Sequence, residues 1–221
     1  MVTHAIRTDV MAGADDPHGD WDRHEVLPFV PGQCEAILDV GCGRGAFGEL
    51  LKLQRPEARV SGIESVPDRA KQATERLDLV TCGSFPYDLP AGEAFDCIVF
   101  NDVLEHLADP WQAINHARSV LSGGHGYVVA SIPNVQHYSV SIKLLLRGEW
   151  HYVDAGILDR THLRFFTKKS MRELFETQGF VVDIVAPINK STGTWIDTLL
   201  ALIPNLTESI CANQYVVVAR T

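Results

Sequence analysis

The sequence predicts a doubly wound α/β domain built on a mostly parallel sheet. Short apolar segments alternate with helical segments along most of the chain, and a glycine-rich turn directly follows the first apolar segment. The alternation is typical of parallel strands joined by helices, and the turn is typical of the first strand-to-helix connection in such folds. With 221 residues, the chain has the length for one generous domain rather than two.

The predicted strands are short and apolar, and helices separate most of them. We expect seven strands, at 36–40, 59–64, 77–82, 95–101, 126–132, 180–186 and 215–219. Helices are expected at 47–53, 67–76, 110–121 and 169–178. Residues 21–27 allow a short helix, which Pro28 ends.

The chain is expected to divide into a short arm and one domain. Residues 1–17 are polar and predict a flexible N-terminal arm, so that residues 18–221 form the domain. Residues 133–167 interrupt the rhythm of strands and helices with aromatic and histidine-rich sequence. Because ligands bind at the carboxyl ends of strands in open α/β sheets, we expect this segment to form a lid over the site.

Charge and cysteine content exclude several classes of protein. The net charge is −9 and no run of Lys and Arg offers a basic footprint, so we expect no nucleic-acid partner. No apolar run approaches membrane-spanning length, and no signal peptide is recognised. The five cysteines are odd in number and scattered, which is typical of reduced thiols. These features predict a cytoplasmic protein that neither spans nor binds a membrane.

A glycine loop follows the first predicted strand and indicates an adenosine-type cofactor. Gly41, Gly43 and Gly45 let the backbone turn sharply, so that its amides can meet a polar ligand at the start of a helix. Glu64 ends the next strand, where a carboxylate can bind both hydroxyls of a ribose. The loop alone fits a nicotinamide dinucleotide as well as S-adenosylmethionine. However, too little chain follows the fifth strand for the second domain that a dinucleotide usually needs.

Three sequence blocks closely resemble the class I S-adenosylmethionine-dependent methyltransferases. They are Leu38-Asp39-Val40-Gly41-Cys42-Gly43-Arg44-Gly45, then Phe95-Asp96, and then Asn101-Asp102-Val103-Leu104-Glu105-His106-Leu107 through Asp109-Pro110. The spacing between the blocks also matches. The resemblance covers roughly residues 36–218, and it implies that the last strand inserts antiparallel into the sheet and that S-adenosylmethionine is the methyl donor.

The resemblance also implies roles for individual residues. The backbone at Gly41 would contact the amino-acid part of the donor, Asp39 would brace the loop, and Glu64 would bind the ribose. Many relatives hold adenine with an acidic residue after the third strand; this chain has Gly83-Ser84-Phe85 there, so adenine is expected near Ser84 and Phe85. The predicted cofactor site comprises Asp39, Gly41, Cys42, Gly43, Gly45, Glu64, Ser65, Ser84, Phe85, Asn101, Asp102, Val103 and His106.

The lid sequence supplies candidates for catalysis. Transfer of a methyl group to a hydroxyl requires a group that removes the proton, and a neutral histidine suits this task near neutral pH. The candidate bases are His137, His151 and His162, with Asp154 or Asp159 as partners that orient the ring. For His162, a structural role in fixing the turn before the helix that follows is an equal alternative.

A divalent cation is a second possibility in the lid. Some sugar methyltransferases use a cation to hold two neighbouring hydroxyls of the acceptor. Asn134, Asp154 and Asp159 carry oxygen donors of the kind that Mg²⁺ binds. Their spacing forms no compact motif, so the sequence leaves metal dependence open.

The acceptor is suggested by a second resemblance. Residues 156–167 resemble a block in bacterial methyltransferases of polysaccharide and nucleotide-sugar biosynthesis, including small actinobacterial sugar O-methyltransferases. This resemblance implies an O-methyltransferase whose acceptor is a saccharide or a sugar-containing small molecule. A methyltransferase for a small phenol, amine or carboxylate remains an alternative, as does an inactive protein that only binds S-adenosylmethionine. The apolar stretch 195–203 leaves room for a homodimer contact.

Overall fold

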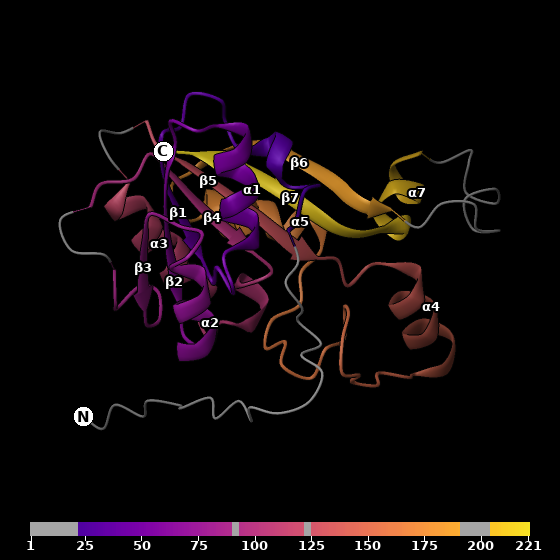
Figure 1. The fold of residues 1–221 in the computed structure, drawn as a ribbon. Coiled ribbons are helices and arrows are strands. Elements are labelled where there is room, and N and C mark those ends of the chain that lie inside the picture. Colours follow the sequence, from indigo (N-terminus) through magenta and orange to yellow (C-terminus); the bar gives the residue numbers. More distant parts are fainter. Residues whose placement is uncertain (1–21, 90–92, 122–124, 191–203) are drawn as a thin grey trace, which may run out of the picture.

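The computed structural model describes residues 22–89, 93–121, 125–190 and 204–221. These residues form a seven-stranded sheet with helices on both faces (Figure 1). The strand order is β3-β2-β1-β4-β5-β7-β6, and neighbours pair in parallel except that β7 runs antiparallel to β5 and β6. The predicted fold class, including the antiparallel last strand, is therefore confirmed.

The observed elements follow the predicted order closely. The strands are β1 (Ala36–Val40), β2 (Arg59–Glu64), β3 (Leu79–Cys82), β4 (Cys97–Asn101), β5 (Tyr127–Pro133), β6 (Val181–Lys190) and β7 (Ala212–Arg220). The α-helices are α1 (Ala46–Gln54), α2 (Pro67–Ala73), α3 (Pro110–Val120), α4 (Tyr138–Arg147), α5 (Lys168–Glu176) and α7 (Pro204–Cys211). Two 3₁₀ turns are η1 (Leu27–Phe29) and η2 (Leu104–His106).

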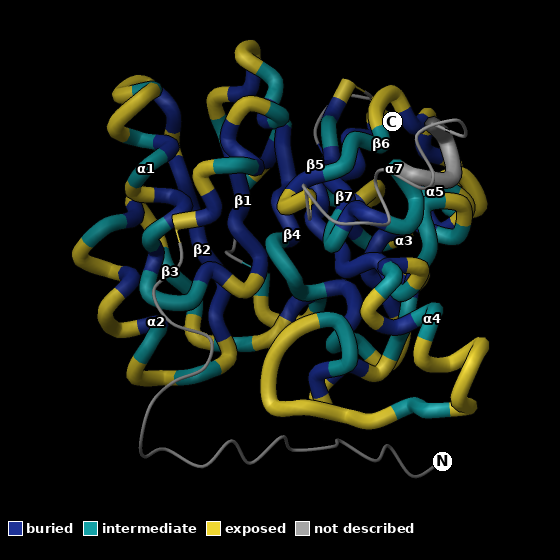
Figure 2. Tube along the Cα trace, turned by 90° about the vertical axis from the view of Figure 1, so that its right-hand side faces the viewer, coloured by how far each residue is buried: buried dark blue, intermediate teal, exposed yellow. Residues whose placement is uncertain are grey.

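The central strands are buried on both faces, which is why their sequences are continuous apolar runs. In β4, Ile98 and Phe100 pack into one core layer, whereas Cys97 and Val99 pack into the other. Helices α3 and α5 cover the first layer, and α1 and α2 cover the second. Figure 2 shows the buried strands in the middle and exposed residues on the outer turns of the helices.

The helices begin where the sequence supplies caps. The Asp109 side chain accepts a hydrogen bond from the N–H of Gln112 at the start of α3, and Pro110 occupies the first turn. Thr167 and Ser170 form a capping box at the start of α5. These caps place both helices next to the segments that bound the site, η2 and the lid.

The lid, residues 133–167, contains a helix that was not predicted from the sequence. Helix α4 starts after His137, whose ring accepts a hydrogen bond from the N–H of Ser139, and it ends at Gly148 with a φ of 65°. Val140 is its one buried residue, while three consecutive leucines at 144–146 are exposed. The apolar residues at 138, 142, 145 and 146 do have helical spacing, so the sequence carried a helix signal that the prediction overlooked.

Two other boundaries differ from the predictions. The chain turns from Asp22 into η1 instead of forming a helix over 21–27, because Pro28 allows only a short turn. Helix α7 was not predicted, and β6 runs four residues beyond the predicted end at Ala186, to Lys190. Both surround the long antiparallel pairing of β6 with β7, which the sequence pattern does not show.

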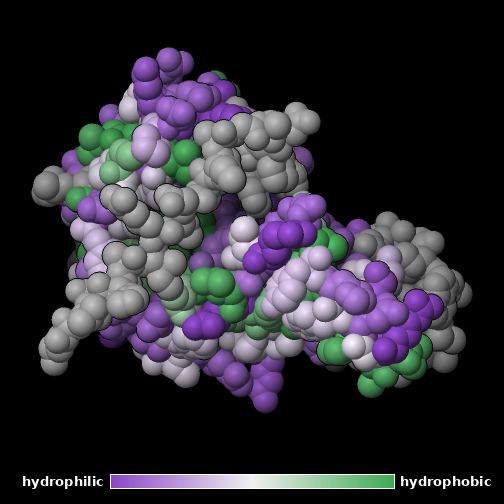
Figure 3. All heavy atoms as spheres, turned by 90° about the horizontal axis from the view of Figure 1, so that it is seen from below, coloured by the Kyte–Doolittle hydropathy of each residue, from purple (hydrophilic) through white to green (hydrophobic). Residues whose placement is uncertain are grey.

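Some predictions concern residues outside those that the structure describes. The N-terminal arm at 1–17 and the apolar stretch at 195–203 are among them, so both remain predictions. Of the helices that can be described, none is long and apolar enough to cross a bilayer. Seen from below, the part of the lid with α4 stands out from the body of the sheet, and hydrophobic and hydrophilic residues lie side by side on it (Figure 3).

Candidate active site

The glycine loop joins β1 to α1 in conformations that side chains rarely adopt. Gly41, Gly43 and Gly45 have φ angles of 70°, 57° and 86°. A Cβ at Gly41 would lie 2.7 Å from Cγ2 of Val103, whereas a Cβ at Gly43 would meet no atom within 4 Å. The loop is thus packed closely at Gly41 and open at Gly43, as a loop that receives a ligand on its backbone requires.

Two buried carboxylates lie next to the loop. Glu64 accepts hydrogen bonds from the N–H groups of Gly43 at 3.0 Å and Val66 at 2.8 Å, and it thereby ties the loop to the end of β2. Asp39, in β1, is 2% exposed. Burial, reinforced by the charge of Glu64, raises the pKa of Asp39 to about 8. Asp39 is therefore mainly a neutral acid at pH 7.

The end of β4 carries an amide without a protein partner. Both polar atoms of the Asn101 side chain are buried and have no hydrogen-bond partner among the described residues. Buried amides are nearly always paired, so this one indicates a ligand that completes its hydrogen bonds. Val103, two residues later, is in contact range of Gly41, which places Asn101 on the same side of the sheet as the loop.

A buried ionic network joins the segment before β1 to three strand ends. The Arg23 guanidinium lies 2.8 Å from Oδ2 of Asp102 and donates to Oγ of Ser131 at 2.9 Å. Gln214, at the start of β7, donates to Oδ1 of Asp102 at 2.9 Å. Burial raises the pKa of Asp102, against the opposing effects of Arg23 and Ser131. The network closes one side of a cavity.

That cavity, about 600 Å³ in volume, lies between the lid and the carboxyl ends of the central strands. The ends of β4, β5 and β7 contribute Asp102, Pro133 and Gln214 to its wall. The lid contributes His151, Asp159 and His162. Its size suits a small organic molecule.

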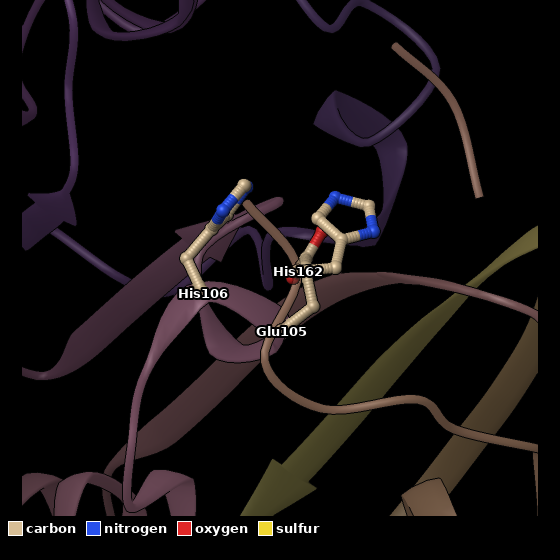
Figure 4. A group of neighbouring side chains, drawn as sticks. All are labelled: Glu105, His106 and His162. Carbon is tan, nitrogen blue, oxygen red and sulfur yellow. The ribbon is translucent and has the colours of Figure 1, made fainter. Parts of the chain in front are cut away.

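Three side chains from two segments converge in this cavity: Glu105 and His106 of η2 and His162 of the lid (Figure 4). Their donor atoms all lie within 4.8 Å of one another, and the two imidazole rings are 4.7 Å apart between centroids. Glu105 is 1% exposed, and neither carboxylate oxygen has a hydrogen-bond partner among the described residues. Burial, with the charge of Asp102 adding to it, raises the pKa of Glu105 well above its usual value.

Comparison with known proteins identifies the scaffold. The methyltransferase domain family matches residues 21–184. The chain belongs to this family. It is an S-adenosylmethionine-dependent methyltransferase domain. S-adenosylmethionine is therefore its cofactor, in agreement with the sequence prediction.

Individual relatives agree with this assignment. The chain is 33% identical to trans-aconitate 2-methyltransferase of Escherichia coli over 139 residues, 60% of this chain and 53% of that protein. It is 32% identical over 180 residues to an uncharacterised 37.1 kDa protein in transposon TN4556 of Streptomyces fradiae, 74% of this chain and 48% of that protein. A solved methyltransferase from Archaeoglobus fulgidus has the same fold, with a TM-score of 0.60 and 20% identity over 89% of this chain and 90% of that one.

The chain spans about half the length of the curated relatives that it matches first. Family membership thus establishes the domain and its donor, while the acceptor must be argued from the cavity.

The methyltransferase domain places most predicted cofactor residues around the loop, with one difference. Phe85 is buried in the core, where its ring packs edge-on against Phe100 at 5.4 Å and His116 at 5.8 Å between centroids. Its faces therefore serve the core, and the expected stacking on adenine does not fit this placement. Ser84 is exposed, and its N–H donates to Asp88.

The remaining predicted cofactor residues have simple placements. Gly45 caps α1, and its N–H donates to the carbonyl of Cys42, whose own side chain is buried. The Ser65 hydroxyl lies 3.5 Å from Oε1 of Glu64. Asp102 and His106 line the cavity under the lid. These two residues lie where donor and acceptor would meet.

The three candidate bases differ in placement. His162 is buried in the cavity wall, and its Nδ1 lies 3.0 Å from the carbonyl oxygen of Ile157. His151 lines the same cavity but is exposed. His137 caps α4 with Nδ1, and burial lowers its pKa. The structure therefore gives His137 a structural contact and leaves two candidates in the cavity.

The residues proposed to bind Mg²⁺ are engaged elsewhere. The Asn134 amide donates to the carbonyls of Ser209 and Ala212. Asp154 is exposed and forms an ion pair with Arg160 at 2.8 Å. Asp159 lines the cavity, but its Oδ1 accepts hydrogen bonds from the N–H and the hydroxyl of Thr161. These three side chains brace the lid, and the convergent donors are the different set around Glu105.

The roles of two residues of the site could not be recognised from the sequence. Arg23 lies in the short segment before η1, where nothing marked it as buried. Glu105 was part of the motif that carried the resemblance, but without an assigned role. Its unpaired carboxylate becomes visible only when the lid folds over η2.

Proposed function

We propose that this domain transfers the methyl group of S-adenosylmethionine to a hydroxyl group of a small, polyhydroxylated acceptor of the saccharide class. The observation that carries the proposal is the orientation of His162 in the cavity. A carbonyl oxygen can only accept a hydrogen bond, so the contact with Ile157 assigns the proton to Nδ1 and leaves the lone pair on Nε2.

This tautomer suits the removal of a proton from a hydroxyl. The acceptor oxygen attacks the methyl carbon, and the carbon–sulfur bond breaks with its electron pair remaining on sulfur. The sulfonium becomes the neutral thioether of S-adenosylhomocysteine, and the hydroxyl proton passes to Nε2 of His162. Because the sulfonium is already a good leaving group, the protein mainly orients the acceptor and accepts this proton.

The composition of the cavity wall supports a polyhydroxylated acceptor. Side chains that donate or accept hydrogen bonds line the cavity, among them Lys143, Glu149, Asn189, Asn213 and Gln214. A sugar has hydroxyls in many directions and can use donors and acceptors together. A volume of about 600 Å³ accommodates a monosaccharide or disaccharide. The resemblance of residues 156–167 to sugar O-methyltransferases favours the same class.

A carboxylate acceptor is the second candidate. Lys143 places an ammonium group at the cavity, and one relative is a trans-aconitate 2-methyltransferase. Methylation of a carboxylate needs no base, because the attacking oxygen is already ionised near pH 7. The two candidates therefore differ in their need for His162.

The test is an acceptor screen that reports release of S-adenosylhomocysteine. Saccharides, phenols, amines and carboxylic acids are compared, and the product is characterised by mass spectrometry and NMR. We expect a methyl ether on a sugar. A methyl ester or an N-methyl product as the sole outcome would show that the acceptor class is wrong.

Matched variants test the role of His162. His162→Ala should lower kcat by about 10²-fold or more, the usual contribution of a positioned base. His151→Ala removes an exposed histidine from the same cavity and should change kcat much less. Equal effects on kcat would contradict the assignment of the base, and binding of S-adenosylhomocysteine by calorimetry confirms that both variants are folded.

A further inference from the structure

We infer that Glu105, His106 and His162 form a binding site for a divalent transition-metal ion of the zinc class. His162 lies more than 50 positions after the adjacent Glu105 and His106, yet one donor atom of each residue lies within 4.8 Å of the others. Figure 4 shows the two rings beside each other, with one nitrogen of His162 turned toward His106 and the other turned away.

The buried carboxylate of Glu105 gives the strongest indication of a bound cation. Glu105 is 1% exposed and has no hydrogen-bond partner for either oxygen among the described residues. A buried carboxylate without partners is expensive to maintain, and such groups are normally paired or bound to a metal. Arg23, whose charge acts on Glu105, is already engaged by Asp102 and Ser131. A cation between Glu105 and the two histidines would satisfy the carboxylate.

The orientation of the rings fits metal coordination. Nδ1 of His162 lies 3.0 Å from the carbonyl of Ile157, and Nδ1 of His106 lies 3.3 Å from the carbonyl of Thr161. Each carbonyl assigns the ring proton to Nδ1, so Nε2 is the nitrogen that carries the lone pair. A ligating histidine commonly donates its other N–H to a backbone carbonyl in this way, which fixes its tautomer.

The donor set selects among cations. Two imidazoles and one carboxylate are typical ligands of Zn²⁺ and of related transition metals, whereas Mg²⁺ prefers oxygen ligands alone. Three protein ligands leave a further coordination position open. Because all three residues line the cavity, that position faces the space for the acceptor.

This placement gives the cation a role that rests on the proposed O-methylation but replaces His162 in activating the hydroxyl, so that the two roles of its Nε2 exclude each other. An acceptor hydroxyl at the open position would bind the cation through oxygen, and the cation would lower the pKa of that hydroxyl. The proton then leaves to water in the cavity, the oxygen attacks the methyl carbon, and the carbon–sulfur electron pair remains on sulfur. In this arrangement Nε2 of His162 is a ligand rather than a base.

Calorimetry with Zn²⁺ on the untagged chain tests the site without any acceptor. We expect about one Zn²⁺ per chain, with affinity at least about 10²-fold weaker in Glu105→Gln and in His162→Ala. His151→Ala, which removes a cavity histidine outside the cluster, should bind Zn²⁺ like the wild type. Mg²⁺ in excess should not compete. Co²⁺ in place of Zn²⁺ should give visible absorption that His162→Ala abolishes.

The outcomes separate the two proposals. If the wild type binds S-adenosylhomocysteine but no Zn²⁺, or if the cluster variants bind Zn²⁺ as tightly as His151→Ala, the metal site is wrong. The role of His162 as a base would survive that result. If Zn²⁺ binds but no hydroxyl compound is methylated, the metal site stands and the proposed acceptor fails. Binding of S-adenosylhomocysteine by each variant shows that it is folded.

Discussion

The glycine loop, which is the proposed donor side of the site, and the lid, the proposed acceptor side, are built in opposite ways. The loop is fixed by backbone conformation, between strands that are buried on both faces. The lid is largely exposed between residues 143 and 156, and its ion pair between Arg160 and Asp154 lies in solvent. The donor side is therefore a rigid part of the scaffold, whereas the acceptor side is a surface segment in which changes cost little stability.

This difference suits a methyltransferase. The donor is the same molecule in every such enzyme, so its site can be built into strand ends and glycine conformations. The acceptor differs among enzymes, and a segment that few buried contacts hold can change its side chains without loss of the fold. Three comparisons between matched positions test whether the two sides differ in this way.

The largest contrast is expected between two arginine ion pairs. Arg23→Ala leaves the half-buried Asp102 without its cation and should lower the free energy of unfolding by about 2–3 kcal/mol, between the costs for exposed and for fully buried pairs. Arg160→Ala removes an exposed pair and should cost at most about 1 kcal/mol. Thermal unfolding of both variants measures the contrast. Equal losses would show that the network does not anchor the segment before β1, and Asp102→Asn added to Arg23→Ala should restore part of the loss.

A second contrast compares two glycines with positive φ. Gly41→Ala combines a φ of 70° with a contact of 2.7 Å to Val103, so we expect at least about tenfold weaker binding of S-adenosylhomocysteine. Gly148→Ala, at the end of α4, has a similar φ of 65° but no neighbour within 4 Å. It should lose about 1 kcal/mol of stability and keep its affinity. Calorimetry separates the two, and normal affinity in Gly41→Ala would contradict the close packing of the loop.

The smallest effect concerns the pH dependence of stability. The pKa of Asp39 is about 8 in the folded chain, against 3.8 for an ordinary aspartate. At pH values between these two, the folded chain binds more protons than the unfolded chain. The stabilisation that protonated Asp39 provides is therefore complete below pH 3.8 and is lost as the pH rises through about 8. Relative to Asp39→Asn, the wild type should lose about 1 kcal/mol of stability from pH 6 to pH 7. Melting temperatures of the two proteins that shift in parallel would show that Asp39 is not protonated in the fold.

The donor side could be predicted well because its signals are local. A strand that is buried on both faces reads as an apolar run, and a loop that needs positive φ reads as glycine. Glu64 was found because it ends the strand after the loop. For Phe85 the sequence could not decide the role, because it does not show whether an aromatic ring packs inward, as this one does against Phe100, or faces a ligand.

The lid was predicted only as a segment that bears histidines. Its helix buries little apolar surface, since Leu144, Leu145 and Leu146 are all exposed. The choice among the three histidines depended on contacts with backbone carbonyls, which no residue pattern encodes.

The sequence by itself determined the doubly wound sheet, the antiparallel last strand, the glycine loop and the methyl donor. These follow from period, turn chemistry and motif spacing, which act over a few residues. Only the tertiary structure decided that Arg23 closes the cavity and that Glu105 and His106 meet His162. Those contacts join residues more than 50 positions apart, and they arise because parallel strands bring their carboxyl ends, and the loops that follow them, to one edge of the sheet.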